Sequence, residues 1–231
     1  KLRFHTQTAG CSLTAQQPEN NIARTGFQAL AGVLGGTQSL HTNSMDETLA
    51  LPSEKAAEIA LRTQQIIAFE TGVSNVVDPL GGSWYLEKLT DEIEEEAESY
   101  FKEIENIGGV IPAIEQGYFQ REIARSASEY QEKVDKNKRI VVGVNDFVKD
   151  NEEIDIPILE ISSKSADDQI KSLEKLKNSR DELALQNSLN EVAIACKNNL
   201  NLVEPIIKAA KHYATIGEIV QKMKGEIGEW Q

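Results

Sequence analysis

The stretches Arg3-Phe-His-Thr-Gln-Thr-Ala-Gly10 and Thr37-Gln-Ser-Leu-His-Thr-Asn43 decide the fold of this 231-residue chain. Side chains over residues 2–8 alternate as in a β-strand, and both stretches end in small polar residues. A helix is predicted between them, because Pro18 suits a first helical turn and Gly35-Gly36 suits a helix end. A strand, a helix and a second strand with a crossover of this length predict a parallel βαβ unit.

The polar residues at the ends of these strands are candidate ligand-binding groups. Parallel-barrel enzymes present amides, hydroxyls and imidazoles at the carboxyl ends of their strands. About eight strands are needed to close such a barrel, so two strands leave open sheet edges, and open edges favour association. We therefore expect the other strands to come from an upstream barrel segment or chain, within an oligomer. The chain opens inside its first strand without Met, so we interpret it as the tail of a larger catalytic unit.

The remainder is predicted to be mainly helical. Two apolar runs, Ile140–Val144 and Ile156–Ile161, are predicted to be strands or extended arms. The acidic stretch 149–155 between them is the best candidate boundary. With a further division where the long helices begin, the predicted regions are 1–87, 88–148 and 149–231. The predicted helices are 53–71, 88–106, 109–136, 166–178, 181–198, 202–212 and 215–227.

Composition narrows the class of protein. Asp and Glu number 37 against 24 Lys and Arg, for a net charge of −13, which argues against a nucleic-acid or anionic-membrane partner. No apolar run reaches membrane-spanning length. Cys11 and Cys196 are too few for a disulfide framework and fit a reducing compartment. We predict a cytoplasmic protein.

Several motifs, in order along the chain, resemble the large subunit of methylmalonyl-CoA mutase. The agreement covers nearly the whole chain and is far more specific than any one motif. The motifs are His5-Thr-Gln-Thr-Ala-Gly-Cys-Ser-Leu-Thr14, Asn20-Asn-Ile-Ala-Arg-Thr25, Gly35-Gly-Thr-Gln-Ser-Leu-His-Thr-Asn43, Asp46-Glu47, Leu51-Pro52, Asp78-Pro-Leu-Gly-Gly-Ser83, Val142-Gly-Val-Asn145 and, more weakly, Tyr213-Ala-Thr-Ile-Gly-Glu218.

The resemblance implies an isomerase that depends on adenosylcobalamin. In this family a (β/α)8 TIM barrel binds an acyl-CoA ester, and a flavodoxin-like module or small subunit carries the cobalamin. An adenosyl radical abstracts a substrate hydrogen, and the thioester group migrates, which interconverts methylmalonyl-CoA and succinyl-CoA. The implied fold class is α/β: the last strands of the TIM barrel, followed by a mainly helical C-terminal region.

The resemblance also assigns roles to residues. Gln7 and Asn43 would end the last two barrel strands and act at the reacting centre and beside the cofactor, as catalytic residues. Glu47 would hold the adenosyl ribose, because a carboxylate accepts two hydrogen bonds from a diol. Four further residues would lie against the corrin: Gly10, Thr48, Ala50 and Leu51.

The chain departs from the family pattern in two ways. Cys11 stands where many relatives carry a bulky aromatic residue. The family's catalytic His, most of its CoA contacts and the cobalt-ligating Asp-x-His-x-x-Gly motif have no counterpart in this sequence. We therefore expect the isolated segment to be inactive, with cobalt ligated by another domain or subunit and no metal ligands in this chain.

Other interpretations stay open. One alternative is a non-catalytic docking module for a cobalamin-binding subunit. Another is part of a sister mutase that acts on isobutyryl-CoA or ethylmalonyl-CoA. His5 and His41 lack a third ligand, so a structural role is favoured over a metal site. Nothing in the neighbouring sequence activates Cys11 as a nucleophile.

Overall fold

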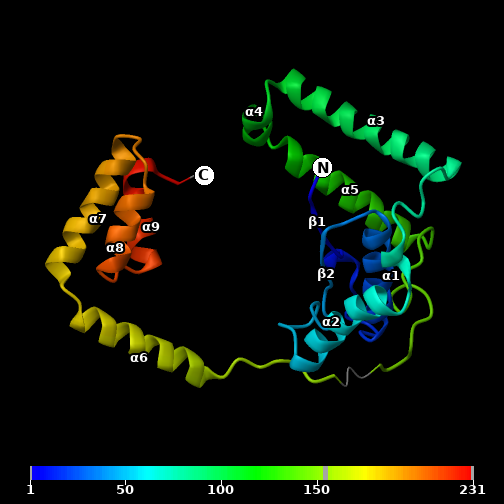
Figure 1. Cartoon of the computed structure of the whole chain (residues 1–231), viewed down its shortest axis with the longest axis horizontal. Coiled ribbons are helices and arrows are strands. Elements are labelled where there is room, and N and C mark those ends of the chain that lie inside the picture. The colour runs from blue at the N-terminus through cyan, green and yellow to red at the C-terminus, as the bar shows by residue number, and fades with distance from the viewer. Residues whose placement is uncertain (1, 153–155, 230–231) are drawn as a thin grey trace. The chain divides into compact units, whose positions relative to one another are not determined.

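The computed structural model describes residues 2–152 and 156–229, and its fold is mixed, mostly helical, with a small parallel sheet (Figure 1). The chain divides into two compact units, Lys1–Leu159 and Glu160–Gln231. Each unit has its own set of packed helices.

The predicted βαβ unit is confirmed in the first unit. Strands β1 (His5–Gln7) and β2 (Ser39–His41) pair in parallel, and α1 (Asn20–Leu34) connects them. Thr6 pairs with Leu40 at the centre of the register. Both strands are shorter than the predicted ranges 2–8 and 37–42, because each has only one neighbouring strand in the part of the chain that the structure describes.

The two faces of this sheet differ. Gly32 of α1 lies so close that a Cβ there would be 3.1 Å from Thr6 Cγ2 and 3.7 Å from Leu40 Cδ1, so α1 covers the face that carries Thr6 and Leu40. Side chains alternate along a strand, so their neighbours project from the opposite face. Those neighbours are polar and exposed: His5, Gln7, Ser39 and His41.

Helix α2 (Glu54–Phe69) follows β2 and packs against α1. Its N-cap is Ser53, whose side chain accepts a hydrogen bond from Ala56 N. Ala56 and Ala60 are buried, and Thr42 Oγ1 donates to Ala60 O at 2.7 Å, which ties the segment after β2 to the helix. A short 3₁₀ helix, η2 (Val73–Asn75), ends this layer.

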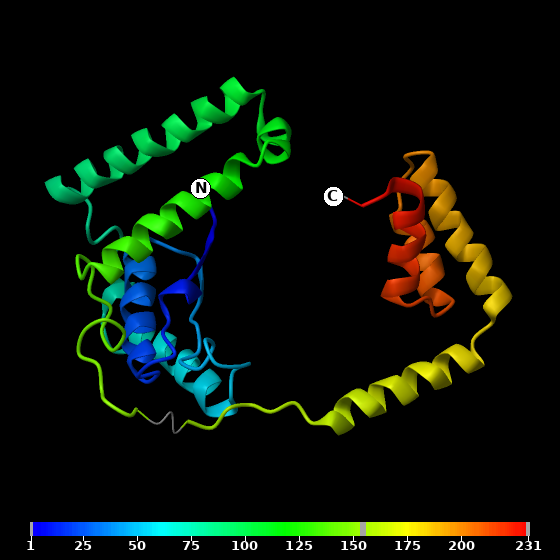
Figure 2. The same ribbon diagram turned by 180° about the vertical axis from the view of Figure 1, so that it is seen from behind.

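The region predicted as helices 88–106 and 109–136 contains three helices. They are α3 (Trp84–Ile107), α4 (Val110–Glu115) and α5 (Tyr118–Asp135). The single helix predicted over 109–136 was wrong, because Gly117 adopts a left-handed φ of 67° and interrupts the helical hydrogen bonds. Figure 2 shows α4 at the junction between α3 and α5.

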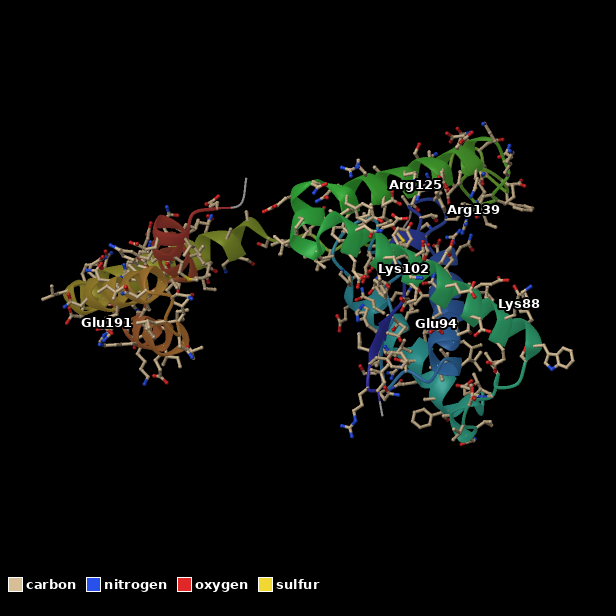
Figure 3. All side chains as sticks on the ribbon, turned by 90° about the horizontal axis from the view of Figure 1, so that it is seen from above. Lys88, Glu94, Lys102, Arg125, Arg139 and Glu191 are labelled. Carbon is tan, nitrogen blue, oxygen red and sulfur yellow. The ribbon has the colours of Figure 1, made fainter. Side chains whose placement is uncertain are left out.

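Both charged and large apolar side chains are exposed along these helices, among the latter Ile93, Phe101 and Ile123. Residues 91–98 are all exposed, and Lys88, Glu94 and Lys102 lie along α3 (Figure 3). On α5, Arg125 pairs with Glu122 at 2.5 Å. Tyr118 donates a hydrogen bond to Glu103 Oε2 at 2.7 Å, which links α5 to α3, and this bond raises the Tyr118 pKa to about 12.

The runs predicted as strands or extended arms form no strand where the structure describes them. Val142 and Asp146 make an isolated parallel bridge within a tight turn. Residues 156–161 are irregular, and residues 153–155 of the predicted acidic boundary lie outside the described residues. Arg24 Nη2 donates to Val142 O at 2.7 Å, so side chains of the first βαβ unit hold the 140–147 turn in place of a neighbouring strand.

Gly143 in this turn should not tolerate a side chain. Its φ is +81°, and a Cβ would lie 2.9 Å from the side chain of buried Gln17. Gly143→Ala should lower the free energy of unfolding by about 1–2 kcal/mol for the left-handed backbone, and further for the clash. Gly36→Ala is the matched control, because Gly36 has a φ of +79° with nothing near its Cβ position. Urea unfolding measures the loss of unfolding free energy in each variant, and equal losses would contradict the clash with Gln17.

The second unit contains four helices in the described range 160–229. They are α6 (Ser163–Ser179), α7 (Glu182–Lys197), α8 (Val203–Lys211) and α9 (Ile216–Ile227). They lie within a few residues of the helices predicted from periodicity. Helix α7 packs against α8 and α9 around a small apolar core formed by Leu185, Leu189, Val192, Ala209 and Ile219.

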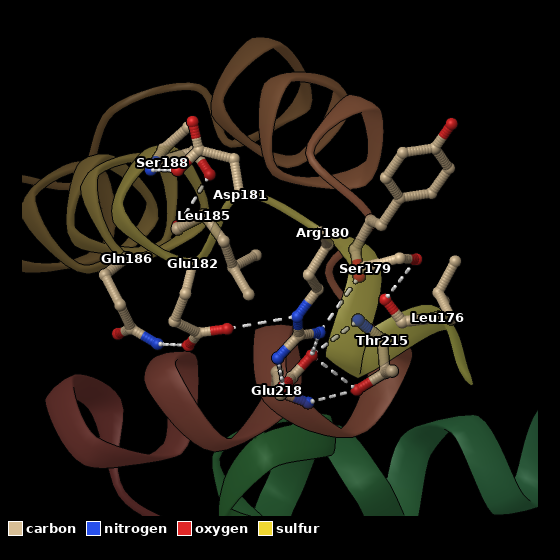
Figure 4. Close-up of polar contacts among 12 residues, drawn as sticks. Leu176, Ser179, Arg180, Asp181, Glu182, Leu185, Gln186, Ser188, Thr215 and Glu218 are labelled. Atoms are coloured by element: carbon tan, nitrogen blue, oxygen red, sulfur yellow. Dashed lines mark hydrogen bonds and ion pairs between the residues drawn. The ribbon is translucent and has the colours of Figure 1, made fainter. Parts of the chain in front are cut away.

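A nearly buried arginine joins the ends of these helices (Figure 4). Arg180 Nη1 and Nη2 donate to the two carboxylate oxygens of Glu218 at 2.9 and 2.6 Å, and Arg180 Nη1 also donates to Tyr213 O at 3.1 Å. Glu218 completes a capping box with Thr215 at the start of α9. The Arg180 hydrogen bonds lower the Glu218 pKa from 4.5 to about 2.

This pair should make the stability of the second unit depend on acid pH. The folded-state pKa of Glu218 is depressed, so its stabilisation is present at neutral pH and is lost as pH falls from about 4.5 towards 2. Glu218→Gln should lower the unfolding free energy at pH 7 by about 2 kcal/mol. Thermal unfolding followed by circular dichroism should show that the difference in melting temperature between wild type and variant becomes smaller as the pH falls over that range.

The matched control is Glu191→Gln. Glu191 pairs with Lys208 on the surface of the same unit, where both side chains are about half exposed. Exposed ion pairs contribute about 0–1 kcal/mol, so this variant should unfold almost as the wild type does. If Glu218→Gln lowers the unfolding free energy at pH 7 by no more than Glu191→Gln does, the role of the Arg180 pair is contradicted.

Candidate functional site

The candidate site lies at the carboxyl ends of β1 and β2. Gln7 is the last residue of β1 and pairs with His41, the last residue of β2. Its side chain is exposed on the polar face of the sheet. Thr8 N donates to His41 O at 3.1 Å, so the chain stays paired for one more step beyond Gln7.

Thr8 and Asn43 then hold the two strand ends together. The Thr8 hydroxyl accepts a hydrogen bond from Asn43 N at 2.9 Å and donates one to Asn43 Oδ1. Both residues are 4% exposed. Because the hydroxyl bonds both the backbone and the side chain of Asn43, it fixes the position and the orientation of that residue.

Asn43 in turn orients the side chain of Glu47. Asn43 Nδ2 donates to Glu47 Oε2. The other carboxylate oxygen of Glu47 makes no hydrogen bond to any described residue, and the side chain is half-buried. A Cβ at Gly10 would be 3.5 Å from Asn43 Nδ2, so Gly10 lies against the same amide. This arrangement presents a carboxylate oxygen that can accept hydrogen bonds from hydroxyl groups of a ligand.

The loop that carries Glu47 is anchored by Asp46. Asp46 is 1% exposed, and its Oδ2 accepts from Ser53 N at 2.9 Å, at the N-cap of α2. Its backbone oxygen accepts from Leu49 N and Ala50 N at 2.9 and 3.1 Å. Asp46 Oδ1 has no partner among the described residues. These bonds close residues 46–53 into a compact loop.

Fully buried Asn21 of α1 joins the segments that follow the two strands. Its Nδ2 donates to Thr14 O and Met45 O, both at 2.9 Å, and its Oδ1 accepts from Thr14 N at 3.0 Å. Arg24 Nη1 adds a bond to Asn21 Oδ1 at 2.8 Å. The amide therefore satisfies backbone groups that burial takes away from water.

The structure brings some of the predicted site residues together. Gly10, Asn43 and Glu47 form one cluster, and Thr48 is tied to the first segment by a bond from its Oγ1 to Thr14 O at 3.2 Å. Gln7 lies at the adjoining strand end. Ala50 and Leu51 belong to the same loop, with Leu51 exposed, and among the described residues no hydrogen bond joins them to Gly10, Asn43 or Glu47.

The sequence reasoning missed the residues that position this cluster. Thr8, Asn21, Arg24 and Asp46 all lie inside the quoted motifs, but none was singled out. The available signal was a polar residue at a position where the helix or strand pattern requires burial, as at Asn21. Predicting its partners requires long-range contacts, which the pattern does not contain.

Other chemistries receive no support from the described residues. His5 Nδ1 lies 2.5 Å from Ser39 Oγ, within the sheet's polar face. In the ranges 2–152 and 156–229, no three His, Cys, Asp or Glu side chains are placed to hold a metal. Cys11 and Cys196 are free thiols. None of the helices described is both long and apolar enough to cross a membrane.

Comparisons with known proteins define the family. The family model described as methylmalonyl-CoA mutase matches residues 1–229. The chain is 45% identical over its whole length to the 2-hydroxyisobutanoyl-CoA mutase large subunit of Aquincola tertiaricarbonis and covers 41% of that protein. It is 43% identical over 99% of its length to methylmalonyl-CoA mutase of Rhizobium meliloti, and 44% identical over 94% to that of Escherichia coli, covering 32% and 30% of them.

The chain belongs to the methylmalonyl-CoA mutase family. Its relatives are mutases, which are isomerases. It spans about a third to two fifths of the length of these relatives.

Asp46 should be required to order the Glu47 loop. Asp46→Ala removes the acceptor for Ser53 N, a loss of about 1 kcal/mol for a partly buried donor, and should increase amide hydrogen exchange over residues 47–53. Asp46→Asn keeps an oxygen at this position and is the matched variant. Exchange in Asp46→Ala that stays at the wild-type rate would show that the loop is ordered without this carboxylate.

Proposed function

We propose that this chain is part of an adenosylcobalamin-dependent acyl-CoA mutase that interconverts methylmalonyl-CoA and succinyl-CoA by rearranging the carbon skeleton. The observation that supports this most directly is the Thr8–Asn43–Glu47 hydrogen-bonded group at the carboxyl ends of two parallel strands, in a chain of the mutase family. Ligand groups gather at that end of the strands in parallel barrels.

In this proposal β1 and β2 are the last two strands of a TIM barrel. The exposed polar face formed by His5, Gln7, Ser39 and His41 would line the barrel interior, while α1 covers the outside. A shallow groove of about 500 Å³ runs beside β2 and is lined by residues including Leu40, Gln64 and Ile67, which gives a neighbouring element a place to pack. The upstream barrel segment or chain would supply the other strands.

The three predicted regions keep distinct roles in the proposal. Residues 1–87 would complete the barrel, residues 88–148 would form a helical extension that packs on it, and residues 149–231 would form a helical linker and C-terminal region. The amphipathic helix α3 supports a packing role for the extension, because within its described range no residue is buried.

The residues of the site fit the cofactor that the family implies. When bound, adenosylcobalamin supplies the radical chemistry of the rearrangement. Glu47 would accept hydrogen bonds from the adenosyl ribose through its free oxygen. Gln7 would orient the substrate, and neutral amides at Gln7 and Asn43 offer no group that readily quenches a radical. The residues proposed to lie against the corrin are Gly10, Thr48, Ala50 and Leu51.

The proposal includes partners outside this chain. The described residues hold no cluster suited to a metal, and the sequence lacks the cobalt-ligating motif, so another domain or a small cobalamin-binding subunit would ligate cobalt. We propose that the segment alone is inactive, that the assembled enzyme is an oligomer in the cytoplasm, and that its substrate is an acyl-CoA. The excess of acidic residues disfavours a nucleic-acid partner.

A sister mutase is the second candidate function. One relative is a 2-hydroxyisobutanoyl-CoA mutase large subunit, and its 45% identity is nearly the same as the 43–44% of two methylmalonyl-CoA mutases. Identity over this segment therefore does not choose the substrate. Isobutyryl-CoA and ethylmalonyl-CoA remain alternative substrates, and a docking module without chemistry remains the alternative from another class.

Reconstitution tests the proposed function. The full-length protein, a cobalamin-binding subunit or module and adenosylcobalamin should convert succinyl-CoA to methylmalonyl-CoA, and turnover should stop when this segment is deleted. If the assembled enzyme instead converts another acyl-CoA in a substrate panel, the proposed substrate is wrong and the proposed class of reaction stands. Cobalamin-subunit binding without turnover of any ester would favour the docking module.

Glu47→Ala should weaken cofactor binding more than substrate binding. Loss of hydrogen bonds to a carboxylate costs about 1.5–3 kcal/mol, so the Kd for adenosylcobalamin should rise about 10-fold to 100-fold. The KM for the CoA ester should change by less than about 3-fold. Absorbance titration and steady-state kinetics measure the two quantities, and equal effects on both would contradict the ribose role.

A further inference from the structure

The orientation of the Asn43 side chain follows from two hydrogen bonds. An asparagine side chain has one acceptor oxygen and one NH2 group with two donors. The Thr8 hydroxyl donates to Asn43 Oδ1, so the NH2 group must face the other way, towards Glu47 and Gly10. In the flipped orientation Asn43 Oδ1 would face the Glu47 carboxylate, and two acceptors would repel.

Burial strongly favours this orientation of the Asn43 amide over the flipped one. Thr8 and Asn43 are both 4% exposed, so water has little access to replace a missing bond. Asn43 N also donates to Thr8 Oγ1 at 2.9 Å, so the same hydroxyl holds the backbone from which the amide extends. Asn43 Nδ2 is in turn the only described partner of the Glu47 carboxylate. Hydrogen bonds therefore connect Thr8 to Asn43, and Asn43 to Glu47.

We propose that Thr8 is a positioning residue for adenosyl recognition: its hydroxyl orients Asn43, and Asn43 aims the free oxygen of Glu47 at the ligand. The inference rests on the proposed function, in which Glu47 accepts from the adenosyl ribose. It adds a residue that touches neither cofactor nor substrate. It also makes Asn43 a positioning residue, because its oxygen and one of its N–H groups are committed within the protein.

A purely structural role for Thr8 leads to a different expectation. If Thr8 only stabilised the strand ends, its loss would weaken every cobalamin equally, because the whole corrin-facing loop would loosen. If Thr8 acts through Glu47, its loss affects only ligands that carry the adenosyl group. Methylcobalamin has the same corrin without adenosyl and therefore separates the two roles.

The experiment compares Kd values for adenosylcobalamin and methylcobalamin in the full-length protein assembled with its cobalamin-binding module. Thr8→Val keeps the shape of the side chain and removes the hydroxyl, and Thr8→Ser keeps the hydroxyl. Loss of one buried hydrogen bond of about 1.4 kcal/mol corresponds to a factor of about 10. Thr8→Val should weaken adenosylcobalamin about 10-fold and methylcobalamin less than 2-fold, and Thr8→Ser should bind both as the wild type does.

A double mutant tests whether Thr8 acts through Glu47. Residues in one hydrogen-bond network have non-additive effects. Thr8→Val should therefore add less than 2-fold to the adenosylcobalamin Kd of Glu47→Ala. Should Thr8→Val fail to fold, Thr8→Cys replaces it, because a thiol is small and hydrogen-bonds only weakly.

The outcomes separate this inference from the proposed function. If Glu47→Ala discriminates between the two cobalamins while Thr8→Val weakens both equally, or if the two effects add, the positioning role is wrong and the ribose role stands. If Glu47→Ala affects both cobalamins equally, the ribose role fails and the Thr8 inference fails with it. Selective loss in Thr8→Val, recovery in Thr8→Ser and non-additivity together establish the positioning role.

Discussion

The register between β1 and β2 is the constraint on which the first unit depends. Side chains alternate with a period of two, so a slip of one residue would move every side chain to the other face. The observed register pairs Thr6 with Leu40 under α1, where Gly32 leaves room for both. It therefore places Gln7 and His41 on the polar face. Continued by one residue, the same register sets Thr8 opposite Thr42 and next to Asn43, so the hydrogen bonds between Thr8 and Asn43 follow from the pairing of the strands.

Polar groups buried beside the strand ends impose a second constraint. Backbone groups in the segments after β1 and β2 cannot continue the sheet ladder, and burial makes an unpaired group costly. Asn21 satisfies groups of both segments, and Asp46 satisfies Ser53 N. Most polar groups near the site therefore have partners inside the protein. Among the predicted site residues, the amide of Gln7 is exposed and one oxygen of Glu47 has no hydrogen bond to a described residue, and both groups are suited to a ligand.

The sequence predicted the elements whose signals are local. The βαβ unit follows from alternation over residues 2–8 and a helix stop at Gly35-Gly36, and the helices of the second unit follow from their periodicity. The break at Gly117 was missed, because a glycine in a helical pattern does not reveal its φ. The run at 140–144 was predicted to be a strand or an extended arm, yet it lies in a turn where Arg24 donates to Val142 O and Gln17 lies beside Gly143. The roles of the site residues stay predictions, and the link between Thr8 and Asn43 spans 35 residues, which no local pattern reveals.

The burial of Asn43 changes what its chemistry can be. The resemblance predicts that Asn43 faces the adenosyl and substrate side, and in the structure its oxygen and one N–H are bonded to Thr8 and Glu47. At most one N–H stays free for a ligand, since the NH2 group has two donors. In the proposed positioning role, this amide contributes mainly by fixing the carboxylate beside it. Glu47 gains a defined direction without a counter-charge, because its described partner is a neutral amide. The free oxygen therefore keeps its full capacity to accept hydrogen bonds, which a pairing lysine or arginine would have reduced.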